Sequence, residues 1–193
     1  TIQRIVPDLI IANKEENVKE QIEELEKQFP VWISDVNKLT DAYEMIEQIG
    51  IISNKESKAK MLISHIKENF SQLQHSNSNP QTIYLIWQKP YMTVGGDTFI
   101  HFMIEAAGFQ NIYANSTRYP EVTIEELKAK NPDLIILSSE PFPFNQKHID
   151  ELQVHLPTTK IVLADGEMFS WYGSRLIKAP AYFATVSEQI VRP

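Results

Sequence analysis

The sequence of 193 residues contains no cysteine. This absence excludes disulfides, zinc–thiolate sites, iron–sulfur clusters and thiol catalysis, and it is compatible with either redox environment. Long apolar runs are missing as well, since no stretch approaches the roughly 18 apolar residues that span a bilayer. Residues 1–4 do not have the pattern of a signal peptide. An exported protein with this sequence would therefore be in a mature or trimmed form.

The sequence contains fewer positively charged than negatively charged residues. Lys and Arg total 18 against 25 Asp and Glu, which gives a net charge of -7. Binding to nucleic acid or to an anionic membrane surface requires clustered Lys and Arg, so the sequence argues against both partners. Hydrophobic residues make up 42% and charged residues 22%, which is typical of a globular protein. The length suits one domain or two small lobes with a real core.

The chain contains one internal repeat. Residues 7–11 read Pro-Asp-Leu-Ile-Ile, and residues 132–136 repeat them. Each copy continues with a polar loop, a helical pattern, a Pro and an apolar run, which ends at Ser34-Asp35 or at Ala164-Asp165. Short apolar strands that alternate with helices predict βαβ units and parallel sheets. We predict two Rossmann-like α/β lobes, with strands at 8–12, 31–34, 82–87, 133–137 and 160–164. The alternative is that Pro-Asp followed by apolar residues begins two strands by chance, without any duplication.

A helix separates the two copies. Ser53 and Glu56 form a capping box, and an apolar stripe then runs from Ala59 to Leu73. We predict one continuous helix over most of residues 55–74, either as a rigid strut between lobes or as an ordinary surface helix. The expected organisation is a partial N-terminal lobe (1–52), a linking helix (53–79) and a C-terminal lobe with a C-terminal helix (80–193).

The first lobe holds only about half of the pattern seen in the second. A lobe without its first strand and helix exposes a sheet edge and an apolar face. We therefore expect this chain to bind ligand poorly or to associate with a second copy through that surface.

Ligands of open parallel sheets bind beyond the carboxyl ends of the strands. In this sequence the segments at those ends are rich in aromatic residues, which suit a flat or apolar ligand: Tyr91, Phe142, Phe144, Phe169, Trp171 and Tyr172. Aromatic side chains that fold back onto the core are the alternative for any one of them. Gly95-Gly96 precedes a helix and could form a rim of backbone N–H groups, but no P-loop lysine follows.

No catalytic set and no bare-metal site can be read from the sequence. His101 and Glu105 are one helical turn apart, yet the HExxH pattern of zinc proteases is absent. No three histidines converge on the predicted strand ends. Hydroxyl and carboxylate groups at 138–140 and 165–167 have no histidine near them in sequence.

The whole chain resembles the periplasmic cobalamin- and ferric-siderophore-binding proteins, which are substrate-binding subunits of ABC importers. The stretches that carry the resemblance are 7–17, 87–99, 118–122, 132–144 and 165–175. The resemblance implies two α/β lobes joined by one rigid helix, with the first lobe truncated at its N-terminus. Asn13 stands where cobalamin-binding relatives often have an aromatic residue, which weakens the implication of cobalamin relative to other chelates.

The resemblance also implies which residues do what. The loops expected to face the ligand contribute Asn13, Lys14, Tyr91, Thr93, Gly95, Gly96, Arg118, Tyr119, Phe142, Phe169, Trp171 and Tyr172. Acidic residues on each lobe are expected to dock onto a basic permease, with Glu16 and Glu20 as candidates on the first lobe and Glu140 or Glu167 on the second.

These inferences predict an extracytoplasmic binding protein, with a lipid anchor in the precursor as an open question. Its partners would be a small-molecule metal chelate and an ABC permease. The protein would need no cofactor, because the metal, cobalt or iron, would belong to the ligand. Two other hypotheses are a small α/β enzyme that binds a phosphorylated metabolite at Gly95-Gly96, and an intracellular carrier of a tetrapyrrole or metal chelate.

Overall fold

The structure is a computed structural model that describes residues 2–73 and 79–191. These residues form two compact units, residues 1–36 and residues 37–193. The sequence placed residues up to 52 in the first lobe. In the structure, residues 37–52 group with the second unit because their helix packs against the helix that follows it.

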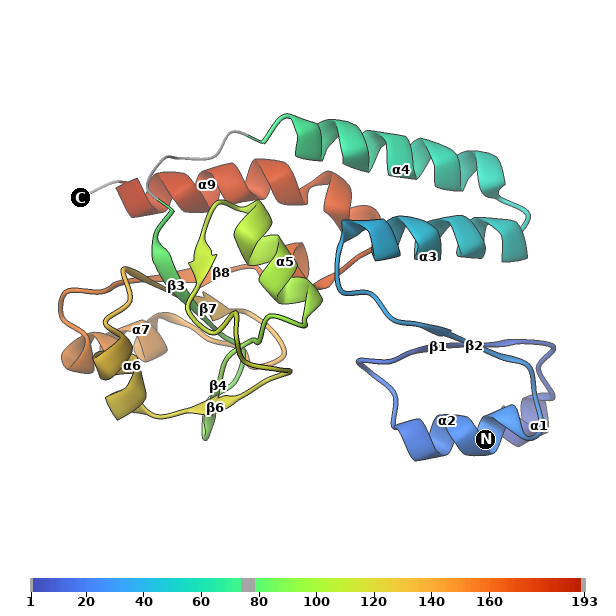
Figure 1. Ribbon diagram of the computed structural model, residues 1–193, viewed down its shortest axis with the longest axis horizontal. Helices are drawn as coiled ribbons and strands as arrows, with labels where there is room; N and C mark the ends of the chain where they lie inside the picture. Colours follow the sequence, from blue (N-terminus) through green and yellow to red (C-terminus); the bar gives the residue numbers. More distant parts are fainter. Residues whose placement is uncertain (1, 74–78, 192–193) are drawn as a thin grey trace. The chain divides into compact units, whose positions relative to one another are not determined.

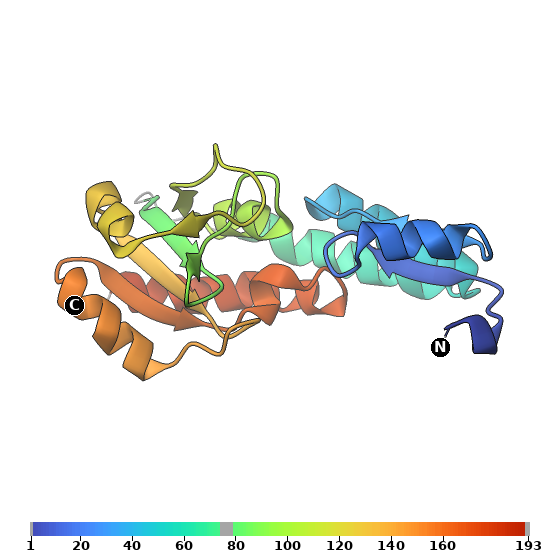
Figure 2. The ribbon, with the colours of Figure 1, turned by 90° about the horizontal axis from the view of Figure 1, so that it is seen from below.

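The first unit is a small α/β element. It consists of α1 (Ile2–Ile5), β1 (Ile10–Asn13), α2 (Lys19–Glu26) and β2 (Val31–Ser34). The two strands pair in parallel, and α2 lies along them (Figures 1 and 2). Ala12 and Ile22 are buried, whereas Ile11 and Ile33 are 53% and 43% exposed. Self-association through these apolar side chains stays a prediction.

The second unit contains the remaining described elements. They are α3 (Leu39–Ile52), α4 (Glu56–Ser71), β3 (Gln81–Leu85), β4 (Tyr91–Met92), α5 (Phe99–Ala106), β5 (Gln110–Asn111), β6 (Glu121–Val122), α6 (Ile124–Lys130), β7 (Leu134–Ser138), α7 (Gln146–His155), β8 (Lys160–Ala164), α8 (Glu167–Ser170), a 3-10 helix η1 (Ser174–Ile177) and α9 (Ala179–Val191). The five predicted strands are present within two residues of their expected bounds. The continuous helix is present as α4.

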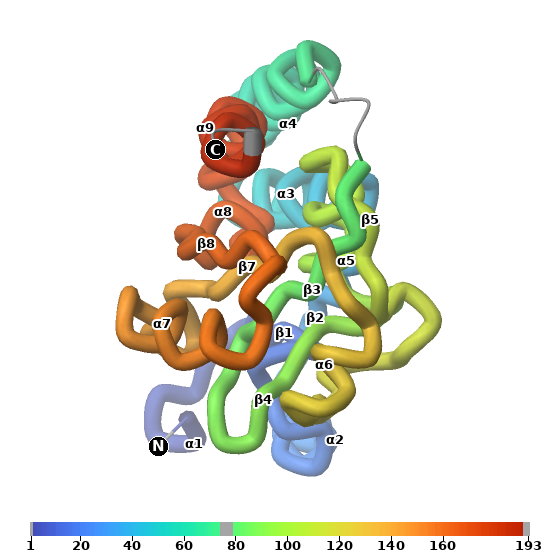
Figure 3. The backbone as a smooth tube through the Cα atoms, turned by 90° about the vertical axis from the view of Figure 1, so that its left-hand side faces the viewer, coloured from blue at the N-terminus to red at the C-terminus, as the bar shows by residue number. Residues whose placement is uncertain are grey.

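The core of the second unit is a parallel sheet in the order β5-β3-β7-β8. Ile83 and Leu85 of β3 point into an apolar cluster with Leu127 of α6 and Leu152 of α7. Tyr84 points to the other face, where its ring lies 5.2 Å from that of Phe169. Figure 3 shows α6 and α7 on one side of the sheet and α8 and α9 on the other. Burial on both faces explains why β3 and β7 read as unbroken apolar runs.

Helices α3 and α4 form an antiparallel pair, which the sequence did not predict (Figure 1). Their close contact is at Gly50, where a Cβ would lie 2.5 Å from the Cβ of Ala59. Two small residues therefore let the helices approach each other. The C-terminal part of α4 is tied to η1 by a hydrogen bond of 2.7 Å from the Asn69 side-chain amide to the carbonyl of Ile177.

Candidate ligand-binding site

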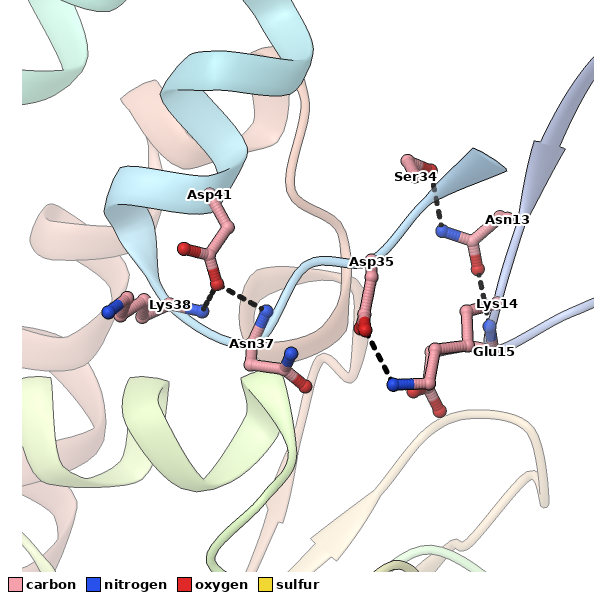
Figure 4. Close-up of polar contacts among 8 residues, drawn as sticks. All are labelled: Asn13, Lys14, Glu15, Ser34, Asp35, Asn37, Lys38 and Asp41. Atoms are coloured by element: carbon pink, nitrogen blue, oxygen red, sulfur yellow. Dashed lines mark hydrogen bonds and ion pairs between the residues drawn. The ribbon is translucent and has the colours of Figure 1, made fainter. Parts of the chain in front are cut away.

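At the carboxyl ends of β1 and β2, Asn13 organises the loop that follows it (Figure 4). Its Nδ2 donates to Ser34 Oγ at 3.0 Å, and its Oδ1 accepts from the backbone N–H of Glu15 at 2.9 Å. Asn17 Oδ1 accepts in turn from the backbone N–H of Asn13 at 2.8 Å. Asn13 is half-buried, and its amide is engaged on both sides. Asn13 therefore holds this loop of the first unit, and its contact with a ligand stays a prediction.

Lys14 is the exposed charge at the same strand ends. Its Nζ lies 2.5 Å from Asp35 Oδ2, so the two residues that follow β1 and β2 form an ion pair (Figure 4). Both side chains are about half exposed, and pairs of this kind contribute roughly 0–1 kcal/mol to stability. The pair can therefore open to let Lys14 contact an anionic group.

The beginning of α3, in the second unit, is held by Asp41. Its Oδ2 accepts from the backbone N–H groups of Asn37 at 3.0 Å and Lys38 at 3.1 Å (Figure 4). An acid in the first turn satisfies N–H groups that have no partner within the helix. These contacts fix the start of α3 within the second unit.

Gly95 and Gly96 join two backbone segments. The N–H of Gly95 donates to the carbonyl of Arg118 at 2.7 Å, and that of Gly96 donates to the carbonyl of Ser116 at 2.9 Å. A Cβ at either glycine would overlap a carbonyl of the 114–117 segment. The glycines are thus needed for close approach of backbone to backbone. Their N–H groups are already used, which removes the basis for an anion cradle at this turn.

Burial removes two residues from the expected ligand contacts. Thr93 is fully buried, and its hydroxyl donates to the carbonyl of Tyr84 at 2.8 Å. Phe169 is also fully buried, and its ring packs against Tyr84 and, at 4.8 Å, against Phe183. Both belong to the core of the second unit.

Arg118 and Tyr119 form a compact pair on the loop before β6. The Arg118 guanidinium carbon lies 5.4 Å from the centre of the Tyr119 ring, a distance typical of a cation–π contact. Arg118 has a left-handed backbone (φ 57), and its N–H donates to Asp97 Oδ1 at 2.5 Å. This bond connects the loop of Arg118 and Tyr119 to the turn before α5. The loop that carries these two predicted ligand contacts is therefore held in position.

Trp171 and Tyr172 follow α8. The Tyr172 ring lies edge-on to Phe99 at 5.2 Å, which connects this loop to the start of α5. Trp171 is 50% exposed, and its Nε1 donates to Glu140 Oε1 at 2.9 Å. Arg175 lies over the same indole, with the guanidinium carbon 5.7 Å from the ring centre. The turn 97–99 thus contacts both Arg118 and Tyr172, so these predicted residues lie around one part of the second unit.

Tyr91 and Phe142 lie elsewhere in the second unit. The Tyr91 hydroxyl is linked to α7 through Gln88. The Gln88 side-chain amide donates to the Tyr91 hydroxyl at 3.1 Å and to Glu151 of α7 at 3.2 Å. Tyr91 lines a hollow of about 620 Å³ whose other walls include Val122 and Val154. Neither Trp171 nor Tyr172 lines that hollow. Tyr91 therefore lies in a hollow that it does not share with these two other predicted aromatic contacts.

Phe142 belongs to an aromatic cluster. Its ring lies 4.7 Å from Phe144, 5.3 Å from His148 and 5.7 Å from Trp87. These edge-on contacts fix the loop between β7 and α7. Trp87, 39% exposed, is the most exposed member of the cluster.

The four acidic residues expected to dock onto a permease differ in their surroundings. Glu16 and Glu20 are exposed on the first unit. Glu140 is half-buried and accepts from Ser170 as well as from Trp171, while Glu167 forms an ion pair with Arg175. Sequence reasoning missed these two networks, although Arg175 stands four residues after Trp171 and Glu167 four before it.

Burial also affects the tyrosines that support the site. It raises the pKa of Tyr84 strongly and that of Tyr182 less. Tyr182 Oη accepts from the backbone N–H of Asp165 at 2.6 Å, so α9 holds the carboxyl end of β8.

In the part of the chain that the structure describes, no group of three His, Asp or Glu side chains is placed to hold a metal ion. Within residues 2–73 and 79–191, no helix is long and apolar enough to cross a membrane.

Comparison with known proteins places this fold in a family. The family model described as "Periplasmic binding protein" matches residues 1–160. A vitamin B12-binding protein of Vibrio parahaemolyticus is 29% identical over 146 residues, which are 71% of this chain and 53% of that protein. The chain therefore spans about half the length of the curated relatives that it matches.

Solved structures show the same fold. A periplasmic haem-binding protein of Pseudomonas aeruginosa superposes with a TM-score of 0.75 at 16% identity, over 96% of this chain and 73% of that one. An Fe3+-hydroxamate transport protein of Saccharomonospora viridis superposes with a TM-score of 0.70 at 18% identity, over 99% and 71%. The parallel α/β fold and the match to residues 1–160 are those of periplasmic binding proteins. The chain belongs to the periplasmic binding protein family.

Proposed function

We propose that this chain belongs to the substrate-binding subunit of an ABC importer that captures a metal-chelate nutrient. The match of the family model to residues 1–160 carries the proposal. The ligand would be a corrinoid, a haem or a ferric siderophore, because relatives named for vitamin B12, haem and Fe3+-hydroxamate all resemble the chain. The protein would act outside the cytoplasm, in the periplasm or held at the membrane surface.

In the second unit, the proposed contacts are Arg118, Tyr119, Trp171 and Tyr172. They combine three aromatic rings with one guanidinium group, on loops that are tied to the turn 97–99. Rings of this kind pack against a flat macrocycle, and an arginine can bind a carboxylate or a polarised oxygen of the chelate. In the first unit, Lys14 is the proposed contact.

Docking onto the permease would use Glu16 and Glu20 of the first unit. Both carboxylates are exposed, as a contact with a basic partner requires. On the second unit, Glu140 and Glu167 are engaged with Trp171 and Arg175, so they would have to exchange partners in order to dock.

The enzyme hypothesis loses its structural basis at Gly95-Gly96. The phosphate would need backbone N–H groups that Ser116 and Arg118 carbonyls already occupy. The family to which the chain belongs is one of binding proteins.

The direct test is titration of the full-length protein with cobalamin, haem and ferric siderophores. Absorbance changes report binding, and thermal unfolding reports the stabilisation, which is about 2.7 kcal/mol at a hundredfold excess over Kd. We expect one of the three classes to bind. Failure of all three would contradict the metal-chelate proposal and leave family membership intact.

A further inference from the structure

The indole of Trp171 is held at its edge and over its face. Its Nε1 donates to Glu140 Oε1 at 2.9 Å, and the Arg175 guanidinium lies 5.7 Å from the ring centre. Half of the Trp171 surface is nevertheless exposed. An exposed aromatic side chain that makes two directional contacts has lost much of its rotamer freedom before any ligand binds.

Glu140 is itself fixed by its surroundings. Ser170 Oγ donates to the same Oε1 at 2.5 Å. Its backbone is held by Ser138, whose hydroxyl donates to the Glu140 carbonyl at 2.6 Å. On the other side, a Cβ at Gly166 would lie 2.5 Å from Glu140 Cγ, so the side chain packs closely against that glycine. The carboxylate therefore has a defined position from which to hold the indole.

Arg175 is fixed in a similar way, through its ion pair with Glu167. Glu167 is in the first turn of α8, and Arg175 is in η1. The two acids that were the alternative docking candidates on the second lobe thus both act on Trp171, Glu140 directly and Glu167 through Arg175.

We infer that Glu140 is a positioning residue that presents Trp171 to the ligand. The inference rests on the proposed function, because it assigns Trp171 to ligand contact. A hydrogen bond to an ionised acceptor is stronger than one between neutral groups. An indole that is already oriented loses less side-chain entropy on binding, which improves affinity without adding a contact. Glu140 need not touch the ligand to have this effect.

The test uses the full-length protein labelled with 5-fluorotryptophan and observed by fluorine NMR. The chain has three tryptophans, and W171F identifies the Trp171 resonance. In Glu140→Ala, we expect that resonance to move to the position of a solvent-exposed, mobile indole. In Glu140→Gln, whose amide oxygen can still accept from Nε1, it should stay near its original position. Glu125→Ala removes an exposed acid from α6 and serves as the control.

Chelate affinity is measured on the same variants with whichever of cobalamin, haem or ferric siderophore binds the wild type. We expect about a fivefold to tenfold loss in Glu140→Ala, the usual size for one net hydrogen bond, and rescue by Glu140→Gln. An unmoved Trp171 resonance in Glu140→Ala overturns the inference, as does a moved resonance with unchanged affinity. If Glu140→Ala does not fold, the wild-type spectrum provides the test, and a mobile Trp171 indole in that spectrum overturns the inference. A wild type that binds none of the chelates refutes the proposed function instead.

Discussion

Two aromatic residues at the C-terminal end of α8, Phe169 and Trp171, have different roles. Trp171 is half exposed, whereas Phe169, two residues earlier, is completely buried against Tyr84 and Phe183. Both came from the same aromatic-rich segment of the sequence. Their exposed fractions decide which one can contact a ligand and which one stabilises the fold.

Trp171→Ala should weaken chelate binding by about 1–3 kcal/mol and leave the free energy of unfolding nearly unchanged. The ring is exposed, so its removal creates no cavity, but a stacking surface is lost. Calorimetry measures the affinity, and denaturant titration checks the fold. Unchanged affinity would remove Trp171 from the site.

Phe169→Ala should give the complementary result. Loss of a fully buried ring leaves a cavity between β3 and α9, and we expect a cost of about 3–5 kcal/mol in unfolding free energy. Denaturant midpoints of the two variants, measured side by side, provide the comparison. A Phe169 variant as stable as Trp171→Ala would contradict the burial of this ring.

The buried Tyr84 predicts sensitivity to alkaline pH. Burial raises its pKa above the usual 10.0, so the folded state retains a proton that the unfolded chain releases. Stability is therefore unaffected below about pH 10 and falls as the pH rises beyond that value. Unfolding free energies between pH 8 and 11 measure the slope. Tyr84→Phe should flatten it while costing about 1 kcal/mol at neutral pH through the lost bond to Ser138.

Among the elements, the pair α3 and α4 depends on two small residues. Gly50→Ala would place a methyl group 2.5 Å from the Cβ of Ala59. We expect a net loss of about 1–3 kcal/mol from overpacking, although alanine is the better helix former. Thermal or denaturant unfolding measures it.

The matched variant for this prediction is Gly50→Ala combined with Ala59→Gly. It restores the space between the helices, so it should recover part of the loss and show a coupling of at least about 0.5 kcal/mol in the double-mutant cycle. Additive effects would mean that the helices do not meet at these residues.

The strands and α4 could be predicted because their periodic patterns and boundary residues are local. The repeat at residues 7–11 and 132–136 indicated parallel strands, and the stripe from Ala59 to Leu73 indicated a long helix. Helix α3 was missed because Lys38 stands at its N-cap in place of Ser, Thr, Asp or Asn, and the capping acid, Asp41, lies inside the first turn.

The candidate site could be predicted only as a set of loops. Arg118 with Tyr119, and Trp171 with Tyr172, lie on loops of the second unit and stay predicted contacts, whereas Thr93 and Phe169 are in its core. Which side chains of a segment are buried depends on its contacts with other elements, such as that of Phe169 with Phe183 of α9. A local sequence pattern does not show such contacts. The Glu140–Trp171 bond joins residues 31 positions apart and has no local signal.

At the scale of the whole molecule, surface charge should affect import through the proposed permease more than it affects chelate affinity. Reversal of Glu16 and Glu20 to Lys in the full-length protein should leave chelate affinity nearly intact and impair import in cells. Surface charges tune encounter and register with a basic partner, and screening acts over about 8 Å in physiological salt. The defect should shrink in reconstituted transport at high salt. Normal import at every salt concentration would contradict the docking role.

The backbone bonds from Gly95 and Gly96 to the 116–118 segment have a kinetic consequence. Because these backbone hydrogen bonds lie within the protein and need no ligand atom, the loop that carries Arg118 and Tyr119 should not have to fold when the proposed chelate binds. Capture by this part of the protein should then proceed at a rate set by diffusion and orientation. Chelates of different affinity would share similar association rates and differ mainly in how long they stay bound.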